Sequence, residues 1–256
     1  MRVLVTRPAA QAADWVVQLQ RESIDAVALP LIGIAPAIDA SVLHAAWCGL
    51  AQRRLVVFVS PNAAEQFFVQ RPLGAQWPAT LLAGSPGPGT TRVLAACGVP
   101  VGQVIEPSAD AAQFDSESLW LQLRRHDWQG ASALIVRGDT GREWLAQALG
   151  EAGAAVDHVG AYRRVRPLFD TSAAALLGAA LARPADHLWF FSSSEAIDNL
   201  ETTPLAAGAA WTEARALATH PRIAARARRA GFTYDNIAEA RPTLAAVVAC
   251  IQSLRT

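Results

Sequence analysis

The sequence predicts an α/β protein made of two similar units, each a three-layer arrangement with a parallel sheet between helices. Short apolar runs alternate with segments of helical periodicity along the chain, a pattern typical of parallel sheets covered on both faces. Parts of this pattern occur twice, which indicates two copies of one α/β unit. The 256 residues are 52% hydrophobic and 17% charged, so the chain can form two small domains or one large one and is not disordered.

Strands are predicted where a short apolar run leads into turn residues and then into a periodic segment. In chain order these runs are Val3–Val5, Ala26–Leu29, Leu55–Val59, Ala79–Ala83, Ala133–Val136, Ala155–Val159, His187–Phe191 and Ala214–Ala218.

The predicted helices follow these runs, and their apolar residues recur at i, i+3 and i+4. Such sets are Ala12, Trp15, Val16 and Leu19; Ala64, Phe67 and Phe68; and Leu145, Ala148 and Leu149. Thr6 stands where it would cap the first helix, and Pro8 lies near the start of that helix.

The repeat consists of two pairs of segments. Residues 58–64 resemble residues 191–197, and residues 4–7 resemble residues 134–137. We call the segment that begins at residues 4–7 a and the segment that begins at residues 58–64 b, with copies a′ from residue 134 and b′ from residue 191. They follow one another as a, b, a′, b′. This order permits two contiguous domains, or an interlaced pair in which b joins a′ and a joins b′.

Two extended stretches bear on that choice. Residues 30–36 and 161–167 each leave the second strand of an a segment and end in proline, as paired strands crossing between domains would. Periodicity alone leaves both arrangements open.

Composition excludes several classes of function. All 22 basic residues are arginine, so Schiff-base chemistry and the phosphate-binding loop that ends in Gly-Lys-Ser/Thr are ruled out. The net charge is zero, which argues against nucleic acid as a partner. The five histidines lack metal-ligand spacing, and Cys48, Cys97 and Cys250 are expected to be reduced, mostly buried thiols. With no leader and no apolar run long enough to span a bilayer, we expect a cytoplasmic protein with no membrane partner.

Hydroxyl residues begin one predicted helix in each copy of the repeat. Ser60 precedes Pro61-Asn62-Ala63 directly after a buried strand, and Ser192–Ser194 hold the equivalent place in the second copy. Free N–H groups and the helix dipole at such a start favour an anion at the carboxyl edge of the sheet. The alternative is an ordinary helix cap, worth about 1 kcal/mol of stability. Two equivalent sites in facing domains support an anion cleft as well as they support two caps.

The glycine-rich stretch Gly84–Thr91 is predicted to be a turn that delivers Thr90 and Thr91 to a helix start. It lacks the lysine and the glycine spacing of a nucleotide site, and its two prolines remove N–H donors. Thr90 departs from the repeat, because its partner is Ile223.

Residues 137–142 place Arg137 and Arg142 at a strand-to-helix junction, where two guanidinium groups suit carboxylate binding. The alternative is a salt-bridged turn with Asp139 and Glu143.

Tyr162 also departs from the repeat. A phenol donates a proton or a hydrogen bond without carrying charge at neutral pH. Spacing alone favours the alternative, a tyrosine packed between the domains.

Taken together, these motifs resemble the uroporphyrinogen-III synthase family of tetrapyrrole and heme biosynthesis over nearly the whole chain. The matching segments are Leu4–Pro8 with Gln11-Ala12, Pro30–Ile32, Phe58–Ala63, Gly87–Thr90, Arg137-Gly138, Gly141-Arg142, Val159–Arg164 and Phe191–Ala196. The resemblance implies two interlaced α/β domains joined by a two-stranded β ladder, one of residues 1–35 with 166–256 and one of residues 36–165.

The resemblance also implies a cyclising lyase. Linear hydroxymethylbilane becomes uroporphyrinogen III with loss of water and inversion of the last pyrrole ring. No metal or organic cofactor is implied. We expect a monomer whose partners are the linear tetrapyrrole and the upstream enzyme that produces it. The competing hypothesis is a non-catalytic two-domain anion-binding or regulatory protein of the same fold.

Site residues are carried over from the family motifs. Tyr162 matches the tyrosine proposed to assist hydroxide loss, and Ser60 and Thr90 match hydroxyls of the family's cleft. Ile223 stands where a second threonine is common, so Thr219 or His220 would have to replace that contact. The expected substrate-binding set is Arg7, Ser60, Asn62, Thr90, Arg137, Gly138, Arg142, Ser193 and Ser194.

Overall fold

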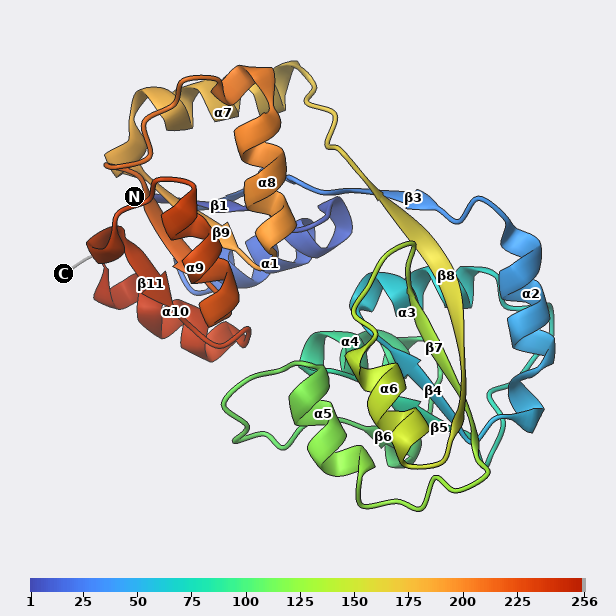
Figure 1. The fold of residues 1–256 in the computed structure, drawn as a ribbon. Helices are drawn as coiled ribbons and strands as arrows, with labels where there is room; N and C mark the ends of the chain where they lie inside the picture. Colours follow the sequence, from blue (N-terminus) through green and yellow to red (C-terminus); the bar gives the residue numbers. More distant parts are fainter. Residues whose placement is uncertain (255–256) are drawn as a thin grey trace. The chain divides into compact units, whose positions relative to one another are not determined.

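The computed structural model describes residues 1–254 and shows two compact units (Figure 1). Unit 1 comprises Met1–Gly33 and Val165–Thr256, of which residues 255 and 256 lie outside the described part, and unit 2 comprises Ile34–Arg164. The chain thus leaves unit 1 once and returns to it. The folding domains expected from the sequence, 1–35 with 166–256 and 36–165, stay a prediction.

Unit 1 contains a five-stranded sheet in the order β11-β10-β9-β1-β2, whose neighbouring strands pair in parallel. The strands are β1 (Arg2–Val5), β2 (Ala26–Ala28), β9 (His187–Phe191), β10 (Arg215–Ala218) and β11 (Ile237–Glu239). Both ends of the chain therefore contribute to one sheet. The central strand β9 is buried along its whole length, as a parallel strand covered on both faces should be.

Five helices accompany this sheet: α1 (Ala9–Arg21), α7 (Thr171–Ala182), α8 (Ser194–Thr202), α9 (Pro221–Arg229) and α10 (Leu244–Ser253). One face of the sheet packs on α1 and α10 in a cluster that includes Phe190, and the other carries the stacked neighbours Trp189 and Phe191.

Thr6 does not cap α1, contrary to the sequence-based expectation. Its buried hydroxyl donates to the Phe190 carbonyl at 2.8 Å, and the cap residue is Pro8, which makes no side-chain cap bond. The hydroxyl thus links β1 to β9.

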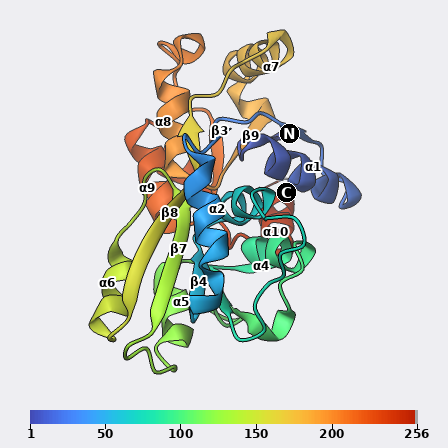
Figure 2. The ribbon, with the colours of Figure 1, turned by 90° about the vertical axis from the view of Figure 1, so that its right-hand side faces the viewer.

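Unit 2 contains a six-stranded sheet in the order β3-β8-β7-β4-β5-β6. The strands are β3 (Gly33–Pro36), β4 (Leu55–Phe58), β5 (Leu82–Gly84), β6 (Val104–Ile105), β7 (Ser132–Gly138) and β8 (Ala155–Val165). The pairs from β8 to β6 are parallel, and β8 runs beside β7 in both views (Figures 1 and 2).

Helices cover both faces of the second sheet: α2 (Ala40–Cys48), α3 (Pro61–Val69), α4 (Pro88–Ala96), α5 (Ser116–Leu123) and α6 (Trp144–Glu151). Alternate residues of β4 point to opposite faces. Phe58 joins a cluster with α2, α3 and α4, whereas Val57 joins one with α5 and α6. The two largely parallel sheets with their helices confirm the predicted α/β class.

Some boundaries differ from the prediction. Strand β8 is 11 residues long because pairing continues past Val159, and β5 begins at Leu82 because the backbone turns at Pro78 to Leu81. Strands β6 and β11 were not predicted as strands, whereas β3 and the end of β8 lie in the two stretches, residues 30–36 and 161–167, that were expected to be extended and paired. Short 3-10 helices occupy Leu50–Gln52, Val101–Gln103, Pro184–Asp186, Pro204–Ala206 and Tyr234–Asn236.

The cysteines are free, and the expectation that they are mostly buried is wrong for Cys48, which is exposed. Burial raises the pKa of the Cys97 and Cys250 thiols, which lowers their reactivity. Among residues 1–254 no helix is long and apolar enough to cross a bilayer, and no group of three or more His, Cys, Asp or Glu could hold a metal ion.

Candidate active site

The carboxyl ends of the parallel strands in unit 2 bring several of the predicted site residues to one edge of the sheet. Strand β4 leads into Ser60, β5 leads into the turn before Thr90, and β7 ends at Gly138. In β8, Tyr162 pairs opposite Gly138, at the same end. Open α/β sheets bind ligands at this edge.

Ser60 and Tyr162 are in contact although they lie 102 positions apart in the sequence. Ser60 caps α3, and its Oγ accepts a hydrogen bond from the Ala63 amide at 3.1 Å, with Pro61 as the first helical residue. The same Oγ lies 3.2 Å from the Tyr162 hydroxyl, and either atom can be the donor. The structure therefore places the predicted catalytic phenol at the positive end of a helix dipole.

A β-bulge directs Tyr162 to this position. Arg137 pairs with Gly160, but the next residue, Gly138, pairs with Tyr162, so Ala161 is an extra residue in β8. Without the bulge, Tyr162 would share the exposed side of the strand with Gly160. With it, both Ala161 and Tyr162 are buried in the cluster under α3.

Gly138 provides the space for the Tyr162 ring. A Cβ at position 138 would lie 3.2 Å from Tyr162 Cζ and 3.3 Å from Cε2, closer than carbon atoms pack. The Asp139 amide also donates to the Tyr162 carbonyl at 2.9 Å, which fixes the backbone beside the ring. Gly138, which the resemblance assigned to substrate binding, is thus in direct contact with the phenol.

Arg164 was quoted in the motif around Tyr162 but was given no role there. Its Nη2 lies 3.4 Å from the Tyr162 hydroxyl oxygen, and its guanidinium carbon lies 5.9 Å from the ring centroid. The spacing of two residues, which places both side chains on one side of a strand, is the signal that would have identified it.

Thr90 lies in the first turn of α4 and is buried, at 2% exposure. The turn before it is held by Ser85, whose hydroxyl donates to the Gly87 carbonyl at 2.9 Å. Thr91 binds both Ser85 Oγ, at 2.9 Å, and Glu106 Oε2, at 2.6 Å. The stretch is a turn leading into a helix, as predicted.

The starts of α3 and α4 are neighbours. A Cβ at Gly89 would contact Pro61 Cγ at 3.7 Å, so the first turns that carry Asn62 and Thr90 lie side by side. Two helix N-termini at one place strengthen the local preference for negative charge.

Arg137 and Arg142 bind carboxylates of the chain itself. Arg137 Nη1 lies 2.5 Å from Glu143 Oε1, and Arg142 binds Glu117 through both terminal nitrogens. These bonds hold the pKa of both glutamates below the usual range. The salt-bridged turn is therefore formed with Glu143, whereas Asp139 is not the carboxylate bound by Arg142. A carboxylate ligand of these arginines would have to compete with these glutamates.

The remaining predicted residues lie in unit 1. Arg7 packs its guanidinium over Trp15 and Phe190, with 5.0 and 5.8 Å to the ring centroids. Ser193 caps α8 by accepting from the Glu195 amide at 3.3 Å, and Ser194 is the first residue of that helix. The predicted helix cap in the second copy is thus confirmed at Ser193.

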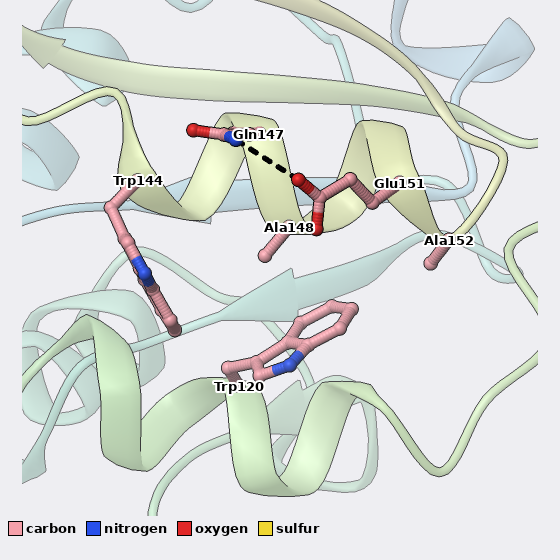
Figure 3. Close-up of a pocket in the computed structure, with 6 residues that line it drawn as sticks. All are labelled: Trp120, Trp144, Gln147, Ala148, Glu151 and Ala152. Carbon is pink, nitrogen blue, oxygen red and sulfur yellow. Dashed lines mark hydrogen bonds between the residues drawn. The ribbon is translucent and has the colours of Figure 1, made fainter.

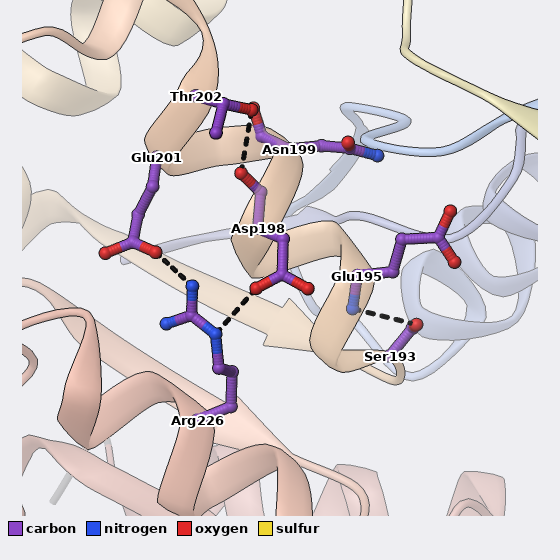
Figure 4. A network of polar contacts seen from close by, with 7 residues as sticks. All are labelled: Ser193, Glu195, Asp198, Asn199, Glu201, Thr202 and Arg226. Carbon is purple, nitrogen blue, oxygen red and sulfur yellow. Dashed lines mark hydrogen bonds and ion pairs between the residues drawn. The ribbon is translucent and has the colours of Figure 1, made fainter.

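Figure 4 shows how the helix that follows Ser193 is anchored. Arg226 on α9 reaches between two acids of α8, with 2.6 Å from its Nε to Asp198 Oδ1 and a second bond to Glu201. Only 17% of the Arg226 side chain is exposed. The network fixes the position of α8 against α9.

Of the proposed substitutes for the missing threonine, His220 is engaged in its own helix. Its Nδ1 accepts from the Arg222 amide at 3.0 Å and caps α9. Thr219 is buried at 6% exposure, and Ile223, the repeat partner of Thr90, is buried at 7%.

A separate recess of about 410 Å³ lies between α5 and α6 (Figure 3). The indoles of Trp120 and Trp144 border it with Ala148, and Gln147 donates to Glu151 at 2.9 Å on its rim. Helices α5 and α6 cover the face of the sheet opposite α3 and α4. The predicted site residues therefore do not line this recess.

Comparison with known proteins gives a consistent picture. A family model described as uroporphyrinogen-III synthase HemD matches residues 13–249. A mutant uroporphyrinogen III synthase from the extremely thermophilic bacterium Thermus thermophilus is 17% identical, with a TM-score of 0.59 over 100% of this chain and 97% of that one. The uroporphyrinogen-III synthetase from Helicobacter pylori is 14% identical, with a TM-score of 0.52 over 99% of both chains. At these identities the structures show a shared fold.

Proposed function

Because the chain belongs to the uroporphyrinogen-III synthase family, it is an enzyme of tetrapyrrole biosynthesis, and we propose that Tyr162 and Ser60 form its reacting centre. The substrate that we propose is hydroxymethylbilane, which loses water and closes to uroporphyrinogen III. The observation that carries the assignment is the 3.2 Å contact between the two hydroxyls at the start of α3.

The phenol assists the departure of hydroxide. The bond between carbon and oxygen of the hydroxymethyl group breaks, and the Tyr162 proton moves to the leaving oxygen, so that water departs. Ser60 and the helix dipole stabilise the phenolate that remains. The freed methylene then bonds to the already substituted α-carbon of the last ring, and the older C–C bond from that carbon to its other methylene breaks. That second methylene bonds to the free α-carbon of the same, now inverted ring, and the proton lost from this carbon restores the phenol.

The other residues hold and fold the substrate. Its carboxylates suit the neighbouring N-termini of α3 and α4, with Asn62 and Thr90 in their first turns. We assign Arg7, Arg137, Arg142, Ser193 and Ser194 to further carboxylate contacts. The electrophile formed by water loss closes readily, so the main contribution of the protein is to hold the chain in the geometry that gives isomer III.

The experiment that tests this function supplies enzymatically made hydroxymethylbilane to the purified protein. The two uroporphyrin isomers are then separated by chromatography after oxidation. Isomer III is expected in excess, and an unchanged yield of isomer I would contradict the proposal. That the enzyme works as a cytoplasmic monomer beside the enzyme that makes its substrate stays a prediction.

A further inference from the structure

The hydroxyl that the proposed function requires is covered in this structure. Tyr162 is 1% exposed, its ring rests against Gly138, and its oxygen contacts Ser60. A substrate oxygen reaches the phenol only if a neighbouring side chain moves. A long, exposed side chain whose contacts with the phenol are weak is the neighbour best able to uncover the hydroxyl.

Arg164 has these properties. It is exposed at the surface of unit 2, and it contacts both the phenol oxygen and the ring. Its 3.4 Å bond is at the long end of the range for N–H···O bonds, and 5.9 Å is at the outer limit for a cation over a ring. Both contacts with Tyr162 are therefore weak, and the arginine stem has several rotatable bonds.

Resting on the proposed function, we propose that Arg164 covers the Tyr162 hydroxyl in the free enzyme and moves to a substrate carboxylate on binding. A guanidinium binds a carboxylate with two parallel charge-assisted hydrogen bonds, which are stronger than its bond to a neutral phenol. A ligand that carries a carboxylate beside the reacting carbon thus uncovers the proton donor, whereas a ligand without one leaves it covered. Arg164 is in this way a substrate-binding and specificity-determining residue.

Chemical nitration measures the cover without turnover. The chain has only two tyrosines, and Tyr234 is 73% exposed, so it serves as an internal positive control. With tetranitromethane, followed by peptide mass spectrometry, the unmodified protein is expected to be nitrated at Tyr234 and protected at Tyr162. Arg164→Ala is expected to be nitrated at both tyrosines. Equal protection of Tyr162 in Arg164→Ala would overturn the proposal.

Arg163→Ala is the matched control. Arg163 is the adjacent residue of β8, on the other side of the strand, and its Nε contacts the Pro36 carbonyl at 3.4 Å. Tyr162 is expected to stay protected in this variant. Nitration of Tyr162 in both variants would mean that any change in this strand loosens it, which would also refute a specific cover.

Kinetics test the second half of the proposal. Arg164→Ala is expected to raise KM by roughly 10-fold or more through the lost charged hydrogen bonds, and Arg164→Lys to restore most of the loss. The contradicting result would be a fall in kcat at constant KM in Arg164→Ala, with no further fall when Arg164→Ala is added to Tyr162→Phe. Arg164 would then act as a counter-ion of the phenolate and not as a carboxylate-binding residue. Full activity of Tyr162→Phe would refute the proposed function, whereas the nitration result would still decide whether Arg164 covers the phenol.

Discussion

Replacing Gly138 by alanine tests how closely the sheet holds Tyr162. The added Cβ would lie 3.2 Å from Cζ, 3.3 Å from Cε2 and 3.5 Å from the hydroxyl oxygen of that ring. Carbon atoms pack at about 3.5–4.0 Å, so the ring has to retreat by roughly 0.5 Å. The Tyr162 hydroxyl also lies 3.2 Å from Ser60 Oγ, so a shift of this size disturbs a contact that is already long for an O–H···O bond.

The expected loss follows from this displacement. A misplacement of about 1 Å at a reacting group costs about 100-fold in rate, so a shift of half that size should lower kcat by roughly 10-fold or more. Overpacking also destabilises the fold by about 1–3 kcal/mol. The assay is single-turnover formation of isomer III, with the melting temperature measured on the same preparations.

Gly150→Ala is the control. A Cβ there meets no atom within 4 Å apart from its own helical turn, and the residue lies in α6, where alanine is preferred to glycine by about 0.5–1 kcal/mol. This variant should keep full activity and melt slightly higher. A folded Gly138→Ala variant with an unchanged rate would refute the reasoning. So would an equal loss of rate when Gly138→Ala is added to Tyr162→Phe, because the effect would then not act through the hydroxyl.

Three further changes have defined outcomes. Ser60→Ala removes the cap of α3, which should cost about 1 kcal/mol by denaturant unfolding, and it should lower the rate less than removal of the phenol does, because the substrate is held at many points. Arg142→Met should lower the melting temperature at pH 7 but have little effect at a pH well below 4.5. The bond from Arg142 lowers the pKa of Glu117. The stabilisation from this ion pair is therefore present above the ordinary value of 4.5 and is lost as the pH falls through the lowered pKa. An equal temperature difference at about pH 3 and about pH 7 would contradict that sign. Protein treated with a chelator should still form isomer III, and restoration of lost activity by an added metal would overturn the cofactor-free mechanism.

Features that depend on neighbouring residues were predictable from the sequence. The buried strand before Ser60, the proline after it and the helical spacing of Ala64, Phe67 and Phe68 are all local, and the structure has the predicted capped helix. The α/β class follows from the same kind of pattern, repeated along the chain.

Features that depend on distant partners were not predictable. Thr6 bonds to the Phe190 carbonyl instead of capping its own helix, because β9 lies beside β1 in the folded sheet. Arg142 pairs with Glu117, which lies 25 positions away on helix α5. A local sequence pattern does not show which distant residue Thr6 or Arg142 will bind.

The geometry of the proposed reacting centre also depends on distant partners, so it was not predictable from the sequence. One extra residue in β8 decides which side of the strand Tyr162 occupies, and the need for glycine at position 138 arises only when the two strands pair. Resemblance to the family identified Tyr162. The bulge, the role of Gly138 and the contact with Arg164 required the structure.

The most direct test of the account is the single-turnover rate of isomer III formation by Tyr162→Phe. The change removes only the hydroxyl, and the ring that packs against Gly138 remains, so the fold and melting temperature should be nearly unchanged. Loss of the proton donor should lower the rate by about 10²-fold or more, with little change in substrate binding. A correctly folded variant with nearly the full rate would contradict the account, because hydroxide loss would then be assisted by water or by the carboxylates of the substrate.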